Sequence, residues 1–255
     1  MLKEKIINSI DTEKIKYSFV VKNLKTDKYY SYNENKVVPS ASLIKIPIMA
    51  EVLNQVKKGE LSLEQKIIIN QDEKVEFSII TLLDIEEYRL LDIIKLMIVY
   101  SDNTATNILI DLVGMDNVNR LIEDIGLKNT IINRKMMDFK ARKEGKENYT
   151  NASDMEKLLK YLYDGKLIDK YFSDLMIEIM IKQTDQSMMA SFIPDEVKIA
   201  RKTGELENLD HDIGIVYYKD REYIFVALTW NAVSNNYARD TLGRISKITF
   251  DYLGK

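Results

Sequence analysis

Ser42 and Lys45 are the first pair of side chains that could carry acyl-transfer chemistry. They stand three residues apart in the segment PSASLIKIPIMAEVL, at the change from a loop to a predicted helix. Positions i and i+3 share one face of a helix, so the Lys45 amine can reach the Ser42 hydroxyl. A serine hydroxyl needs an adjacent base, and a lysine with a pKa lowered by burial can act as one. The alternative is a serine that caps the helix next to a surface lysine, but no other serine of the chain has Lys at this spacing.

Ser101, Asp102 and Asn103 form a polar triplet between two apolar helical stretches in KLMIVYSDNTATNILIDLVG. A binary helical pattern would not place polar residues at this point. The triplet therefore indicates a site, although Ser101 could simply cap the second helix, with Asn103 in its first turn.

Lys202, Thr203 and Gly204 lie on a predicted edge strand in VKIARKTGELENLDHDIGIVYY. A lysine and a threonine on such a strand can bind a carboxylate through charge and a hydroxyl. A glycine there lets a substrate approach the backbone closely. The alternative is a strand whose lysine and threonine face solvent.

The chain has no Cys and one His, His211. This excludes a Cys nucleophile, a disulfide scaffold, an iron–sulfur cluster and a zinc site built from Cys or from several imidazoles. A Ser42–His211–Asp212 triad is poor, because adjacent residues of a strand point to opposite faces. The general base is therefore expected to be Lys, Asp or Glu, and we expect neither a metal nor a cofactor.

The composition is that of a globular protein, with 45% hydrophobic and 30% charged residues and a formal net charge of −3. The mixed charge of Lys140–Lys146 argues against a nucleic-acid partner. No apolar run approaches the about 18 residues of a membrane span. The N-terminus lacks the apolar core of a signal peptide, so the sequence as written predicts a cytoplasmic protein. A chain from which a signal peptide had been removed would look the same and would be secreted or periplasmic.

The elements that must position these motifs fall into three blocks. Residues 17–33 predict a β-hairpin, and three strands follow from Val197. Between them the 3–4-residue apolar spacing predicts helices at 46–56, 82–100, 104–112, 118–125 and 155–163, with a closing helix at 237–253. We expect an α/β (α+β) fold with a five-stranded antiparallel sheet built from both chain ends. Residues 1–45 and 191–255 would form an α/β subdomain and 46–190 an inserted all-α subdomain, with the active-site cleft between them.

Ser-x-x-Lys, Ser-Asp-Asn and Lys-Thr-Gly occur in the order found in serine β-lactamases and penicillin-binding proteins. From about Tyr17 to Leu253 the chain resembles the class A serine β-lactamases. SDNTATNILIDLVG and HDIGIVYY match segments of that family, and NQDEKVEFSIIT is similar to the stretch that carries its aromatic gate, here Phe77.

The resemblance implies a role for each matching residue. Ser42 would be the acylated nucleophile, Lys45 its proton acceptor, and Ser101 the proton shuttle to the β-lactam nitrogen. The backbone N–H groups of Ser42 and Glu205 would form the oxyanion hole. Asn103 would bind the amide of the substrate side chain, and Lys202 and Thr203 would hold the substrate carboxylate.

The chain departs from the family in the loop NRKMMDFKARKEGKENYTNASDM. Class A enzymes carry a Glu-x-x-x-Asn pattern there, and its Glu activates the deacylating water; this pattern is not found at its expected position. Its expected position falls near Lys135–Asp138, where Asp138 is the nearest carboxylate and a possible deacylation base. Glu144 and Glu147 are further away and are expected to face solvent.

Three hypotheses follow. The first is a class A-like β-lactamase, a serine hydrolase that opens the cyclic amide of a small β-lactam. The second is a penicillin-binding or DD-peptidase-like relative that deacylates slowly and acts on peptides like those of peptidoglycan. The third is a non-catalytic receptor for such molecules. The family's usual state implies a monomer.

Overall fold

Both ends of the chain contribute strands to one sheet, as the two β-rich segments predict. The computed structural model describes residues 1–219 and 221–253. Antiparallel pairing gives the order β2-β1-β9-β8-β7. The strands are β1 (Lys16–Asn23), β2 (Tyr29–Tyr32), β7 (Lys198–Leu206), β8 (Leu209–Tyr217) and β9 (Tyr223–Trp230). The strand that carries Lys202 is therefore an edge strand, as expected.

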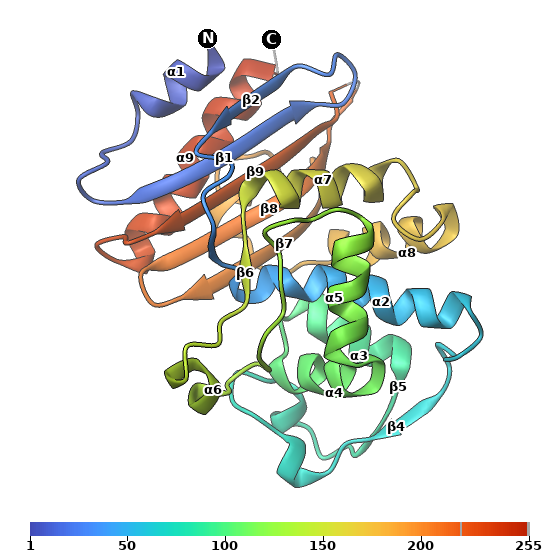
Figure 1. The fold of residues 1–255 in the computed structure, drawn as a ribbon. Coiled ribbons are helices and arrows are strands. Elements are labelled where there is room, and N and C mark those ends of the chain that lie inside the picture. The colour runs from blue at the N-terminus through green and yellow to red at the C-terminus, as the bar shows by residue number, and fades with distance from the viewer. Residues whose placement is uncertain (220, 254–255) are drawn as a thin grey trace.

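Helices cover both faces of this sheet (Figure 1). They are α1 (Leu2–Ile7), α2 (Lys45–Lys57), α3 (Leu90–Val99), α4 (Asn103–Val113), α5 (Met115–Asp124), α6 (Phe139–Lys143), α7 (Ala152–Tyr163), α8 (Lys170–Ile181) and α9 (Asn235–Leu253). Short 3₁₀ helices lie at η1 (Ala41–Ile44), η2 (Gln71–Glu73), η3 (Ile80–Leu82) and η4 (Met188–Ala190). None of the helices in the described part of the chain is long and apolar enough to cross a membrane.

The two faces of the sheet belong to two hydrophobic cores. On β1, Phe19 and Val21 pack with residues of α1 and α9, while Val20 between them packs with the helical part. This alternation follows from the period of two residues in a strand. The sheet thus separates α1 and α9 from the remaining helices and holds both layers in register.

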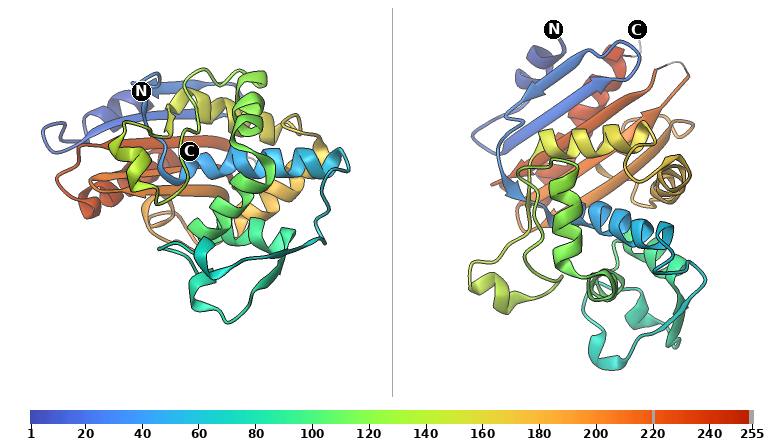
Figure 2. Two further views of the ribbon diagram at one scale, coloured as in Figure 1. Left: turned by 60° about the horizontal axis from the view of Figure 1, so that its bottom comes forward. Right: turned by 45° about the vertical axis from the view of Figure 1, so that its right-hand side comes forward.

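Helix α2 passes through the middle of the helical part, as the two views of Figure 2 show. Its residues Lys45–Leu53 are all buried, and it contacts α3, α4, α5 and α8. A helix that is buried on every side is held by packing all round. The N-terminus of α2, which carries Lys45, directly follows η1 (Ala41–Ile44), and η1 contacts the edge strand β7.

One predicted helix is wrong at its start. Residues 82–100 do not form a continuous helix, since only Leu90–Val99 are helical. Before them, β5 (Glu87–Arg89) pairs with β4 (Lys66–Ile68), and this pairing outweighs the local helical periodicity. Another short pair joins β3 (Val38–Pro39) to β6 (Tyr149–Thr150). The division into two subdomains stays a prediction.

Gly214 gives a test of how tightly β8 packs against β7. A Cβ at this position would lie 2.7 Å from the Ala200 carbonyl oxygen and 2.8 Å from Arg201 Cβ. Because the first obstacle is backbone, Gly214→Ala should lower the free energy of unfolding by about 2 kcal/mol, measured by urea denaturation.

Gly243→Ala is the matched control. Its Cβ would meet the side chains of Ser191 and Phe192, which can turn away, and alanine favours the helix. Equal losses in the two variants would contradict the packing argument.

Candidate active site

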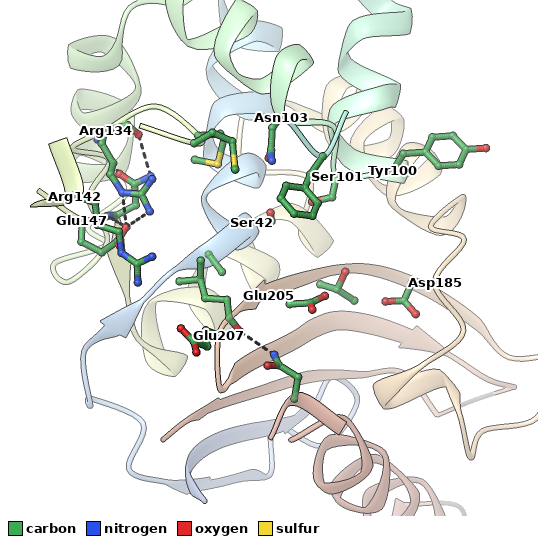
Figure 3. Close-up of a pocket in the computed structure, with 18 of the residues that line it drawn as sticks. Ser42, Tyr100, Ser101, Asn103, Arg134, Arg142, Glu147, Asp185, Glu205 and Glu207 are labelled. Carbon is green, nitrogen blue, oxygen red and sulfur yellow. Dashed lines mark hydrogen bonds and ion pairs between the residues drawn. The ribbon is translucent and has the colours of Figure 1, made fainter. Parts of the chain in front are cut away.

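Ser42 lies in η1, directly before α2. Side chains three residues apart eclipse one another in a 3₁₀ helix, so Ser42 and Lys45 project to the same side. Ser42 lines a cavity of about 820 Å³ together with Ser101, Asn103 and Thr203. The structure therefore brings the three sequence motifs to one cavity (Figure 3).

Lys45 is completely buried and is bonded to the Ser101–Asn103 segment. Its Nζ lies 2.6 Å from the Ser101 carbonyl oxygen, 3.1 Å from Ser101 Oγ and 3.0 Å from Asn103 Oδ1, and the protonated amine can donate to all three. These contacts join the start of α2 to the start of α4. Lys45, three residues after the nucleophile candidate, therefore contacts Ser101 directly.

Lys202 reaches the same hydroxyl from the edge of the sheet. Its Nζ donates to Ser101 Oγ at 3.0 Å and to the Thr203 carbonyl oxygen at 2.8 Å. Ser101 Oγ thus accepts from two buried lysines that are distant from it in the sequence. No other hydroxyl in the described residues shows this arrangement among its hydrogen bonds.

The two lysines lose basicity through burial. Desolvation, reinforced by the positive charge of Lys202, holds the pKa of Lys45 well below its usual value, although Asp102 opposes the shift. Burial lowers the pKa of Lys202 to about 7, although the negative charges of Asp212 and Asp185 oppose this shift. A neutral Lys45 can accept a proton near neutral pH, which a surface lysine cannot do.

Asp102, the middle residue of the triplet, positions its neighbours. Its carboxylate caps α4 by accepting from Ala105 N at 2.8 Å, and it also accepts from Ser78 Oγ at 2.7 Å and Ile80 N at 3.0 Å. The cap of α4 is therefore Asp102 and not Ser101. With Asp102 fixed, Ser101 adopts a left-handed backbone with φ 57° and presents its hydroxyl to the lysines.

The sequence predicts that Gly204 lets a substrate approach the backbone of β7. In the structure the close neighbour of Gly204 is the segment that carries Ala41 and Ser42. A Cβ here would lie 3.1 Å from Ala41 Cβ and 3.2 Å from Ser42 N. The segment that approaches β7 is thus the one that carries the nucleophile. Ser42 and Glu205, whose N–H groups are the predicted oxyanion hole, both line the cavity.

Phe77 and Tyr100 stand at the mouth of the cavity. The Phe77 side chain is 77% exposed. Its carbonyl oxygen accepts from Asn103 N, so the backbone of Phe77 is bonded to the Ser101–Asn103 triplet. The wall opposite is formed by the loop before β6, which contributes Met136, Met137 and Phe139. These three side chains make their part of the wall apolar.

The carboxylates of that loop are engaged elsewhere. Asp138 Oδ1 caps α6 by accepting from Ala141 N at 2.9 Å, and Asp138 is not among the residues that line the cavity. Its role as a base stays a prediction that this geometry does not favour. The expectation that Glu147 faces solvent is wrong, because Glu147 is buried and its carboxylate pairs with Arg134 at 2.8 Å and Arg142 at 3.4 Å.

Sequence reasoning missed several residues of the cavity wall. They are the ion-paired group Arg134, Arg142 and Glu147, the acidic residues Asp185 and Glu207, and Asn235 of α9. Opposite charges at the two ends of one loop are the signal that could have indicated the first group. Among the described residues, no group of three or more His, Asp or Glu side chains converges as metal ligands would.

Comparisons with known proteins agree with this geometry. β-Lactamase VEB-1 of Pseudomonas aeruginosa is 26% identical over 97% of this chain and 89% of its own length. A β-lactamase structure from Chitinophaga pinensis is 25% identical, with a TM-score of 0.92 over 98% of each chain. A PBP-A mutant, solved as an acyl-enzyme complex with penicillin G, is 23% identical, with a TM-score of 0.91 over 99% of this chain and 96% of its own.

The family model described as "Beta-lactamase enzyme family" matches residues 1–253. With the three motifs gathered at one cavity of the expected fold, this chain belongs to the β-lactamase enzyme family.

Proposed function

We propose that the protein is a class A-like serine β-lactamase that opens the β-lactam ring through an acyl-enzyme on Ser42. The observation that carries this proposal is the convergence of Lys45 and Lys202 on Ser101 Oγ beside Ser42. Every group of this arrangement comes from one chain, which fits a monomer.

In the acylation step Ser42 Oγ attacks the β-lactam carbonyl carbon and its proton passes to neutral Lys45. The backbone N–H groups of Ser42 and Glu205 stabilise the negative charge on the carbonyl oxygen, a contribution worth about a hundredfold or more in rate. Burial of Lys45 supports this step, since only the neutral amine can take the proton.

The ring then opens as the C–N bond breaks and the nitrogen takes the Ser101 hydroxyl proton. Lys45 and Lys202 both contact that hydroxyl, so either can restore its proton. Charged Lys202 and the Thr203 hydroxyl would hold the substrate carboxylate, and Asn103 the side-chain amide.

Deacylation is the weak step of this cycle. The loop wall of the cavity carries Met136 and Met137, and the carboxylate of Glu147 is paired with two arginines. This observation favours a second candidate, a penicillin-binding or peptidase-like enzyme with a long-lived acyl-enzyme and a peptidoglycan-like peptide as substrate.

Incubation with penicillin G, followed by intact mass over time, tests the proposal. The wild type should gain the mass of penicillin, and Ser42→Ala should gain none. Ser40→Ala is the matched control, because this neighbouring serine is fully buried and should leave the adduct unchanged. An adduct on Ser42→Ala would show that the nucleophile is another residue, and no adduct or turnover in the wild type would rule out both enzymes for this substrate.

Met136→Glu should shorten the life of the adduct. The backbone of Met136 is fixed on both sides by Asn107, whose Oδ1 accepts from Met136 N at 2.8 Å and whose Nδ2 donates to Met136 O at 3.1 Å. A carboxylate at this fixed point of the cavity wall could activate water, and we expect deacylation to rise by about a hundredfold.

Met137→Glu and Asp138→Asn complete that test. Met137 lines the same wall with a left-handed backbone but lacks the two hydrogen bonds from Asn107, so Met137→Glu should raise the deacylation rate by less than Met136→Glu does. If Asp138 were the base, Asp138→Asn would lengthen the adduct life; we expect it unchanged. Equal deacylation in Met136→Glu and the wild type would contradict the assignment of this wall.

The pH dependence of acylation tests the state of Lys202. Its charged form binds the substrate carboxylate, and its pKa is lowered to about 7, so the second-order acylation rate constant should fall as pH rises through about 7. Lys202→Arg keeps the charge and should remove this alkaline limb. Lys135→Arg, an exposed lysine paired with Asp111, should leave the profile as in the wild type; an alkaline limb that survives in Lys202→Arg would assign it to another group.

A further inference from the structure

His211 is the one histidine of the chain, and it is completely buried in β8 beside the active site. The mechanism above does not use it. In the sheet it pairs with Gly204 of β7, the residue that packs against Ser42. His211 therefore lies directly across the strand pair from the point where the nucleophile segment meets the sheet.

The imidazole makes one contact that leaves the sheet. Its Nε2 lies 2.8 Å from the carbonyl oxygen of Pro39, which precedes the nucleophile segment Ser40–Ser42. A carbonyl oxygen can only accept, so Nε2 carries the hydrogen of this bond. Burial lowers the pKa of His211 to about 4, so the ring is neutral near pH 7.

The other ring nitrogen is fixed by β9. Thr229 N lies 3.2 Å from Nδ1 and donates to it, which agrees with the neutral Nε2–H tautomer. In this tautomer Nδ1 has no hydrogen to give to the Asp210 carbonyl oxygen 2.8 Å away, which accepts instead from Thr229 Oγ1 at 2.8 Å. The ring is thus held by β8 and β9 and directs its N–H at Pro39.

The segment that receives this bond is strained. Ala41 has φ 46°, a left-handed backbone that costs about 1–3 kcal/mol in a residue other than glycine and persists only where its surroundings impose it. On one side Ser40 N donates to the Asn148 carbonyl oxygen at 2.8 Å. On the other side the His211 bond and the Gly204 contact hold it against β7.

We propose that His211 is a positioning residue for the nucleophile: its Nε2–H bond to Pro39 fixes the Pro39–Ser42 backbone and so sets Ser42 Oγ and the Ser42 N–H against Glu205. The proposal rests on the proposed function only in that Ser42 is the nucleophile. A misplacement of about 1 Å at a reacting group can cost about a hundredfold in rate.

Two amide variants separate this bond from the rest of the packing. In His211→Gln the side-chain nitrogen stands as many bonds from Cβ as Nε2 does, so it can still donate to Pro39. In His211→Asn the shorter amide can accept from Thr229 N in place of Nδ1, but it cannot reach Pro39. The two variants should unfold at similar urea concentrations, because each leaves one contact of the ring unmade.

The readout is the acylation rate constant for penicillin G, separated from substrate binding by its dependence on concentration. His211→Asn should acylate about tenfold to a hundredfold more slowly with binding little changed, and His211→Gln should recover to within about threefold of the wild type. The affinity of phenylboronic acid, which forms a tetrahedral adduct with the serine, should fall in the same order. Wild-type rates in His211→Asn, or equal losses in both variants, would overturn the proposal.

An alkyl fluorophosphonate distinguishes failure of this proposal from failure of the proposed function. It reacts at activated serines: Ser42 Oγ bonds to phosphorus, fluoride leaves and the serine proton passes to the base. If the wild type reacts with this probe but not with penicillin, the β-lactamase function fails and the same order of rates still tests His211. If the wild type reacts with neither, Ser42 is not an activated nucleophile and the positioning role is overturned with it.

Discussion

Two buried lysines that share one hydroxyl are the constraint on which the rest of the structure depends. Lys45 and Lys202 are both completely shielded from solvent, and both donate to Ser101 Oγ. Two adjacent buried cations are costly, so the arrangement favours loss of a proton from one of them. In the proposed mechanism this is what makes Lys45 a base, and it requires the start of α2, the start of α4 and the edge strand β7 to meet at one point.

The backbone around that point is held in an unfavourable conformation. Ala41, Phe77, Ser101 and Met137 all have a positive φ, and all four line the cavity. Such residues persist where neighbouring contacts over-determine them. Buried side chains supply those contacts: Asp102 for the loop that carries Phe77 and Ser101, Asn107 beside Met137, and His211 for the segment of Ala41.

The sequence predicts the site better than it predicts the supporting contacts. Ser42, Lys45, Ser101, Asn103, Lys202 and Thr203 could be found because each belongs to a short motif with a defined spacing. The sheet could be predicted from period-two patterns at both chain ends. The roles of Asp102 and Glu147 could not, because each depends on partners that come together only in the fold.

The two wrong predictions, a solvent-facing Glu147 and a helix at residues 82–89, have the same physical cause. Glu147 looks solvent-facing in a loop of lysines and arginines, yet one of those arginines, Arg142, and the more distant Arg134 bury it. Residues 82–89 have helical periodicity, yet β4 takes part of them as a strand. In both cases a tertiary partner outweighs the local pattern.

In the proposed mechanism, the packing that makes Lys45 the acylating base supplies no matching base from the loop before β6 for the hydrolytic half of the cycle. A carboxylate that activates water needs a free lone pair facing the acyl group. The oxygens of Glu147 are instead engaged, since they accept from two guanidinium groups and from Asn148 N. Met136, whose backbone is held by Asn107, and Met137 line the same cavity, and their side chains offer no proton acceptor. In the proposed mechanism, acylation and hydrolysis therefore depend on different parts of the fold, the lysine pair at the sheet edge and the loop before β6. A change in the loop is then expected to alter hydrolysis without disturbing acylation.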